Sequence, residues 1–221
     1  VGYIPTINDI DFDLLKEKEA LDVLQILYKF EEILKDQRIL KVYKNIETEI
    51  FHIGTDAVYG CLACGACSKL GKCVLDDVSN KLAEKMQEAD GIILGSPVYY
   101  ASINGSFGAA LDKAFYQNAQ AYENKIGAAV VSCRRGGATA AFDEINKYFT
   151  ICGMPVASST YWNEVHGFTP EDVEKDQEGL QTMRNLGRNM AFLIKAIKDA
   201  KEKYGLPEKE RTYFTCFHDG K

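Results

Sequence analysis

The sequence predicts one α/β domain built on a parallel sheet. Short apolar segments that read as strands alternate with longer segments of helical period, and Gly- or Pro-containing loops follow the apolar segments. A length of 221 residues fits one domain with additions better than two independent folds. We therefore expect a single domain over residues 1–221, with an atypical segment at 1–45 and an extension at 205–221.

The first half of the chain begins with a predicted helix. Apolar residues recur three or four positions apart from Leu14 to about Lys44. Ile46–Ile53 is rich in β-branched residues and partly alternating, which predicts a strand. Asp76 and Asp77 open a predicted helix that runs to about Ala89, because acidic side chains can cap the amides of a first turn.

The second half repeats the alternation of strand and helix. Strands are expected at Gly91–Gly95, Ile126–Ser132 and Pro155–Trp162, and helices at about Asn104–Gln117, Thr139–Thr150 and Pro170–Lys203. The first of these strands is an uninterrupted apolar run, as in strands covered on both faces. Strands that alternate with helices imply parallel pairing through crossover connections.

Composition argues against several classes of partner and location. The net charge of −6 and the absence of a basic stripe argue against nucleic-acid binding. The uncharged span Gly91–Leu111 holds Gly, Ser, Pro and Asn, whose backbone breaks would find no partners in lipid. Val1–Asn8 has no secretory pattern, so we expect a cytoplasmic protein with no membrane contact.

Two loops at the expected carboxyl edge of the sheet are candidate ligand contacts, since ligands of open parallel sheets bind there. In Gly95–Tyr100, Gly and Pro fix a turn, and two tyrosines can lie against a flat ring or simply cover the core edge. In Ser132–Thr139, two glycines allow close backbone approach. Arg134 and Arg135 offer forked donors to an anion, or are a solvated pair beside a Gly turn.

A third loop concentrates cysteine. Four of the seven cysteines fall within thirteen residues, at Cys61, Cys64, Cys67 and Cys73. The close spacing, together with an odd total number of cysteines, favours metal or redox chemistry in a reducing compartment over a disulfide framework. The thiolates can converge on an iron–sulfur cluster. Zinc, or a loop of small residues without a metal, remains open.

Taken together, these motifs resemble the NAD(P)H-dependent FMN reductase family, and within it the iron–sulfur flavoproteins and their relatives without a cluster. The resemblance is carried, in chain order, by Gly60-Cys-x-x-Cys-x-x-Cys67 with Cys73 and Asp76-Asp77, by Ala89–Tyr100 and by Ser132–Gly137. It runs from about Ile46 to Leu193.

The resemblance implies a flavodoxin-like, doubly wound fold of three α/β/α layers that binds FMN and uses NAD(P)H as co-substrate. The implied FMN contacts are Ser96, Pro97, Val98, Tyr99, Tyr100, Asn104, Gly105, Ser132, Arg134, Arg135, Gly136 and Gly137. The four clustered cysteines would ligate one 4Fe-4S cluster. The flavin would carry the redox chemistry, so no protein base is required.

One family feature is missing from its usual place. Members begin with a strand followed by a Gly-Ser-x-Arg loop that holds the FMN phosphate. The aligned segment Asp22–Phe30 contains no Gly, Ser or Thr and has a helical pattern. Val1–Asn8 offers Thr6 and Asn8 as substitute phosphate contacts.

The expected function is an FMN-dependent oxidoreductase. It would pass electrons from NAD(P)H or a redox protein to quinones, nitro compounds or another electron carrier. A stand-alone electron carrier is one alternative, and a non-catalytic flavodoxin-like binding or assembly module that has lost the phosphate loop is another. We expect a homo-oligomer, because a cleft open on one side is often completed by a second copy.

Overall fold

The structure is a computed structural model that describes residues 46–210, 212, 213 and 215. Its elements are α3 (Cys67–Leu70), α4 (Val78–Glu88), β1 (Gly91–Pro97), α5 (Gly105–Asn118), the 3-10 helix η2 (Ala119–Tyr122), β2 (Ile126–Cys133), α6 (Ala138–Ile151), β3 (Glu164–His166), α7 (Pro170–Val173) and α8 (Gln177–Tyr204). The predicted helix Leu14–Lys44 and the segments Val1–Asn8 and Asp22–Phe30 lie outside the described residues.

The three described strands form one parallel sheet in the order β1-β2-β3. Pro97 at the end of β1 is in register with Ser132, and Cys133 at the end of β2 is in register with His166 of β3. The carboxyl ends of the strands therefore meet at one edge, as the sequence predicts for a parallel sheet.

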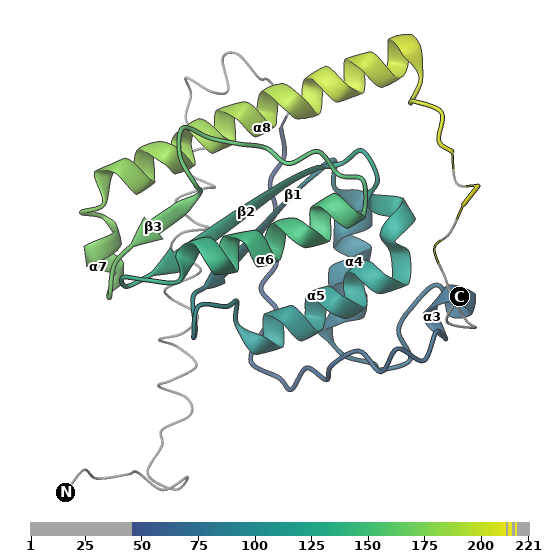
Figure 1. The fold of residues 1–221 in the computed structure, drawn as a ribbon, viewed down its shortest axis with the longest axis horizontal. Coiled ribbons are helices and arrows are strands. Elements are labelled where there is room, and N and C mark those ends of the chain that lie inside the picture. The colour runs from purple at the N-terminus through teal and green to yellow at the C-terminus, as the bar shows by residue number, and fades with distance from the viewer. Residues whose placement is uncertain (1–45, 211, 214, 216–221) are drawn as a thin grey trace, which may run out of the picture.

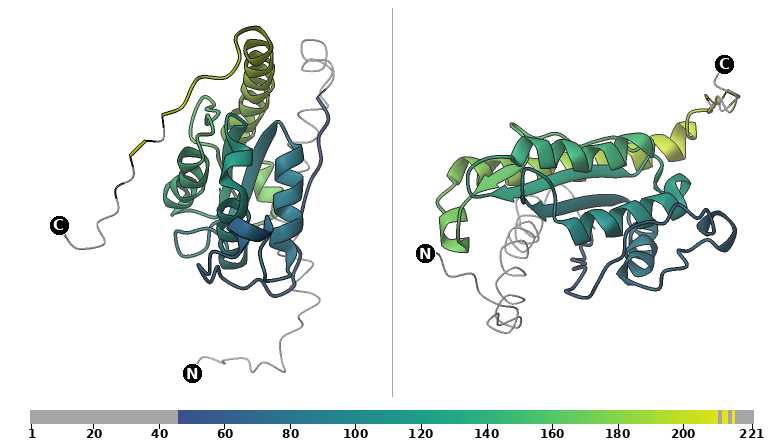
Figure 2. Two further views of the ribbon diagram at one scale, coloured as in Figure 1. Left: turned by 90° about the vertical axis from the view of Figure 1, so that its right-hand side faces the viewer. Right: turned by 60° about the horizontal axis from the view of Figure 1, so that its bottom comes forward.

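Helices cover both faces of this sheet, and each face has its own core. On one face, side chains of α4, α5 and α6, such as Leu82, Leu111 and Ile145, pack with β1 and β2. On the other face, α8 packs through Met183, Leu186 and Met190. Figures 1 and 2 show α8 as the long helix that runs along the sheet. The expected three-layer α/β/α arrangement is confirmed for the described residues.

Side-chain caps define the start of the main helices. Asp77 accepts from the amide of Ser79 at the start of α4, and Asn104 accepts from the amide of Phe107 at the start of α5. Asp, Asn and Ser are the residues that satisfy such first-turn amides. Within the described residues, no helix combines the length and apolar character that crossing a membrane requires.

The predicted strand Ile46–Ile53 is wrong, because the structure gives this segment no strand. Phe51 and Ile53 nevertheless pack against the core. The resemblance implies a sheet in which this segment would be an edge strand that pairs only with the strand preceding it in the chain. The described residues contain no strand before this segment, so it has no ladder partner among them.

The predicted strand Pro155–Trp162 is also wrong for most of its length. Val156 makes an isolated bridge to Gly127, after which the chain leaves β2 and returns at β3. The segment between this bridge and β3 is bound to α8, since Asn189 Nδ2 donates to the carbonyl of Ser158 at 2.7 Å. Asn163 Nδ2 fills the interrupted ladder by donating to the carbonyl of Ala129 at 3.0 Å.

The predicted helix Pro170–Lys203 is divided into α7 and α8. Thr169 and Asp172 form a capping box at the start of α7. Asp176 then accepts from the amide of Gly179 at 2.9 Å and begins a second helix. The same carboxylate accepts from the amide of His166 at 2.8 Å, which ties the break to β3.

Candidate functional site

The loop after β1 closes as a tight hairpin. The amide and carbonyl of Tyr99 bond those of Ser102 at 2.9 Å in both directions. The two residues between them, Tyr100 and Ala101, both have positive φ, at 51° and 59°. This geometry disfavours residues other than glycine, and such strain often accumulates at ligand sites. It leaves the Tyr100 side chain fully exposed.

The loops after β1 and β2 contact each other directly. The amide of Val98 donates to the carbonyl of Ser132 at 2.9 Å, which extends the ladder beyond the strands. Gly137 has a φ of +91° and lies against Ala101, where a Cβ at position 137 would be 2.7 Å from the Ala101 Cα. The structure thus places the two predicted loops side by side.

Side chains beneath the hairpin hold it in place. Buried Ser96 accepts from the amide of Asn104 at 3.0 Å, which links the end of β1 to the cap of α5. Glu144, on α6, accepts from Ser102 Oγ at 2.7 Å and from the amide of Ile103 at 3.1 Å. Glu144 was not predicted from the sequence, because a glutamate on an amphipathic helix carries no signal of this contact.

The loop after β2 exposes its polar groups. Arg134, Arg135 and Gly136 are all exposed. Helix α6 begins at Gly137 without a side-chain cap. Helix N-termini of this kind attract anions and polar ring atoms. Cys133 is buried, and burial raises the pKa of its thiol although the amides of Arg135 and Ala138 donate to the sulfur. It is therefore a packing residue.

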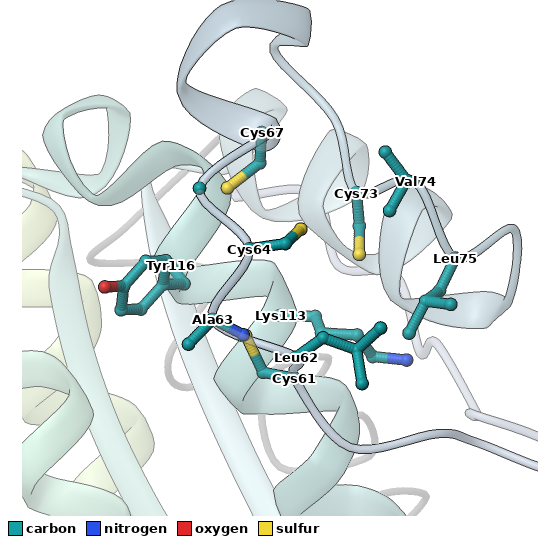
Figure 3. A pocket seen from close by; sticks show the side chains of 11 residues that line it. Cys61, Leu62, Ala63, Cys64, Cys67, Cys73, Val74, Leu75, Lys113 and Tyr116 are labelled. Atoms are coloured by element: carbon teal, nitrogen blue, oxygen red, sulfur yellow. The ribbon is translucent and has the colours of Figure 1, made fainter.

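The four clustered cysteines line one pocket at the outer end of α5. Figure 3 shows their side chains around the pocket, with Lys113 and Tyr116 of α5. The short helix α3 (Cys67–Leu70) was not predicted from the sequence, and it is capped by Gly71, where φ is +70°. All four thiols are free.

Hydrogen bonds between the backbone of Cys73 and side chains of α4 and α5 fix one end of the cysteine loop. The amide of Cys73 donates to Asn80 Oδ1 at 2.9 Å and to Gln117 Oε1 at 3.1 Å. Asn80 Nδ2 donates back to the carbonyl of Cys73 at 3.2 Å. The remainder of the loop is more exposed, and Cys61 and Cys64 are surface residues. Cys73 is therefore anchored to α4 and α5, while Cys61 and Cys64 lie on the exposed part of the loop and Cys67 begins α3.

The donor set of this pocket fits a thiolate-bound metal or cluster, because four soft sulfur ligands line it. In the part of the chain that the structure describes, no three His, Cys, Asp or Glu side chains are grouped closely enough to hold a metal ion. The outer cysteines would therefore have to move inward for all four to share one centre.

A buried ion pair lies beneath the cysteines. The Lys113 side chain has no exposed surface, and its ammonium contacts Asp77, whose side chain is 10% exposed. Burial alone would raise the pKa of Asp77, but hydrogen bonds from Lys113 and Ser79 outweigh it and lower the pKa below 3.8. Lys113 was not predicted from the sequence. Its signal is a lysine one turn or less from the apolar residues Ala110, Leu111, Ala114 and Phe115.

Comparison with known proteins agrees with this geometry. A profile described as NADPH-dependent FMN reductase matches residues 25–169. An iron–sulfur flavoprotein of Methanocaldococcus jannaschii is 34% identical over 70% of this chain and 84% of its own length. An iron–sulfur flavoprotein of Methanosarcina thermophila is 31% identical over 72% of this chain and 85% of its own.

A solved structure supports the fold. RosB, with a bound 8-demethyl-8-formylriboflavin-5'-phosphate intermediate, superposes with a TM-score of 0.50 at 15% identity, over 85% of this chain and 86% of its own. The fold is flavodoxin-like, as the resemblance implies. With the profile match over most of the described domain, these findings show that the chain belongs to the NADPH-dependent FMN reductase family of flavin-dependent oxidoreductases.

Proposed function

We propose that this chain binds FMN at the loops after β1 and β2, and that it passes electrons from NAD(P)H or a redox protein to quinones, nitro compounds or another electron carrier. The observation that carries the proposal is the contact of Gly137 with Ala101. Through this contact the loop after β1, which ends in the Tyr99–Ser102 hairpin, and the Ser132–Gly137 loop form one surface at the carboxyl edge of the sheet, where ligands of such sheets bind.

The residues of this surface suit a flat ring that carries hydrogen-bond acceptors. Tyr100 presents an exposed aromatic face from a backbone that two hydrogen bonds hold in place. Arg134 and Arg135 supply cationic donors beside the exposed Gly136. FMN, when bound, would supply the electron-transfer chemistry, and the chain would bind, orient and shield it.

We further propose that Cys61, Cys64, Cys67 and Cys73 ligate one 4Fe-4S cluster. Their position around one pocket supports this set of four ligands. The relatives from Methanocaldococcus jannaschii and Methanosarcina thermophila are named iron–sulfur flavoproteins, which favours a cluster over zinc. Clusters of this kind are held by four cysteine thiolates, which a Gly-containing loop can supply locally.

A visible spectrum of anaerobically purified protein tests both proposals. We expect flavin absorbance with FMN released on denaturation, together with iron and sulfide in equal amounts. Cys73→Ser should remove the iron and keep the flavin. The matched control is Cys152→Ser, since Cys152 is buried elsewhere in the core and should keep both.

Three other outcomes would replace the proposal. A colourless protein that takes up no added FMN would be a binding or assembly module. Flavin that NADPH does not bleach would indicate an electron carrier. Zinc in place of iron after anaerobic reconstitution would assign the cysteine pocket to a structural metal.

We also propose that a second copy of the chain completes the site, since the fully exposed Tyr100 leaves the surface open on one side. Analytical ultracentrifugation of wild type and Tyr100→Ala tests this idea. A monomeric wild-type protein would contradict it.

A further inference from the structure

Lys113 is a fully buried lysine, which is unusual for a residue with a purely structural role. Its side chain has no exposed surface, yet it lies on α5 between the apolar residues Leu111 and Phe115. Lysines are almost never fully buried unless they are paired. The desolvation of an ion pair also offsets most of its attraction, so apolar residues of similar volume often stabilise a core as well or better. Packing alone does not account for a lysine here.

The partner of Lys113 is fixed from the opposite side. Asp77 Oδ1 accepts from the amide of Ser79 at 3.0 Å and from its hydroxyl at 2.6 Å, while Oδ2 faces Lys113. One carboxylate oxygen therefore caps α4 and the other holds the ammonium. This arrangement leaves Lys113 little freedom to move toward solvent.

The same part of α5 reaches the cysteine loop. Gln117, one turn beyond Lys113, accepts from the amide of Cys73 and donates to the carbonyl of Ser79. Lys113 itself lines the pocket with all four cysteines. The other lysines near the loop, Lys69 and Lys72, are exposed, so water and salt screen their charges. Lys113 is thus the buried cation of this pocket among the described residues.

We propose that Lys113, held by Asp77, sets the charge balance of the cysteine pocket and stabilises the more anionic state of the group bound there. This inference rests on the proposed function of the pocket. Four thiolates around a cluster carry net negative charge, and taking up one electron adds one more. The net charge near a cluster is one of the factors that set its reduction potential. Lys113 is a positioning residue and is not itself a ligand.

Opposite effects of the two partners follow from this proposal. Lys113→Met removes the buried positive charge, so the reduced cluster loses stability and the midpoint potential falls. Asp77→Asn keeps an N-cap but removes the compensating negative charge, so the potential rises. We expect about a tenfold change in the equilibrium constant for reduction in each direction, or ~59 mV for one electron. A purely structural pair would lower cluster content in both variants without opposite shifts.

The experiment is a redox titration of the reconstituted protein with dithionite, followed by visible and EPR spectra. Lys72→Met is the matched control, because it removes an exposed lysine beside Cys73 and should leave the potential unchanged. If Lys113→Met fails to fold, Asp77→Asn is compared with the double variant Lys113→Met/Asp77→Asn, and the single variant should have the higher potential. Equal potentials, or shifts of the same sign in both single variants, would overturn the inference.

Cobalt binding separates this inference from the cluster assignment. Co²⁺ held by four thiolates is also an anionic centre, and its sulfur charge-transfer bands report the affinity directly. We expect metal-free Lys113→Met to bind Co²⁺ about tenfold more weakly than wild type, and Asp77→Asn more tightly. If wild type takes up no iron and sulfide but this ranking holds, the cluster proposal fails and the role of Lys113 stands. If iron and sulfide bind but the ranking and the potentials do not change, the role of Lys113 fails alone.

Discussion

Gly137 and Ala101 touch so closely that a side chain at position 137 has no room: a Cβ there would lie 2.7 Å from the Cα and 2.9 Å from the Cβ of Ala101. The two residues belong to different loops, and their contact is backbone against backbone. The separation of the two candidate flavin loops is therefore set by a missing side chain.

Gly137→Ala should weaken FMN binding. The added methyl group pushes the loops apart, and the φ of +91° is itself unfavourable for alanine by about 1 kcal/mol. We expect at least a tenfold higher dissociation constant for FMN, measured by quenching of flavin fluorescence. Gly60→Ala is the control, because a Cβ at that position meets nothing within 4 Å. Unchanged affinity in Gly137→Ala would contradict the assignment of this surface.

Glu144 should matter for FMN binding although it lies beneath the hairpin. Glu144→Ala removes the acceptor of Ser102 Oγ and of the Ile103 amide, so the hairpin loses its link to α6. We expect the free energy of unfolding to fall by about 1–3 kcal/mol and FMN binding to weaken. Glu144→Gln keeps an acceptor oxygen and should retain most of both. Equal losses in the two variants would show that charge, and not the hydrogen bonds, is what matters.

Asn80 should control cluster content. Asn80→Asp keeps an acceptor for the Cys73 amide but loses the donor to the carbonyls of Cys73 and Leu75. The anchored end of the cysteine loop would loosen, so we expect less iron per chain after anaerobic reconstitution, with the flavin unchanged. Asn189→Asp is the control on α8, far along the chain from the loop. Full iron content in Asn80→Asp would show that this anchor is dispensable.

Asp77 should make the protein sensitive to acid. Its pKa is lower in the folded state than the ordinary value of 3.8, so its stabilising effect is present above that value and is lost as the pH falls through the folded pKa. Thermal unfolding followed by circular dichroism should therefore show a shallower loss of stability below pH 3.8 for Asp77→Asn than for wild type. Asp172→Asn, whose pairing with Lys175 is at the surface, should change this slope less.

The contribution of the core between α5 and the sheet to stability can be tested at Leu111. The residue is fully buried on α5 against the strands. Leu111→Ala should lower the free energy of unfolding by about 2–5 kcal/mol, because it removes apolar contacts and leaves a cavity. Urea unfolding measures the difference, and a change below 1 kcal/mol would place this residue at the margin of the core.

The sequence predicted elements well where each element is determined locally. β1, β2, α4, α5 and α6 follow from apolar runs, helical period and caps such as Asp77, and each differs from the prediction by only a few residues at its ends. Both candidate loops lie where the parallel order requires. The resemblance to a family was confirmed by comparison, while the residues named for FMN and for the cluster stay predictions.

Elements that depend on distant partners were predicted poorly. Ile46–Ile53 has the composition of a strand but no neighbouring strand among the described residues, and composition does not reveal a missing partner. Ser158 leaves the sheet because α8 supplies a hydrogen bond to it from thirty-one positions away. Asp176 divides the long helix by accepting from both His166 and Gly179. Lys113 and Glu144 likewise owe their roles to contacts that pattern alone does not show.

Helix α5 is capped by Asn104, next to the hairpin, and its last turn carries Gln117, which binds the cysteine loop. At a rise of ~1.5 Å per residue, its length fixes the span between the two regions at roughly 20 Å. An α-helix resists compression along its axis, so α5 keeps the distance between the hairpin and the cysteine loop constant. Any change in their spacing would have to come from the loops or from a neighbouring molecule, and not from the scaffold.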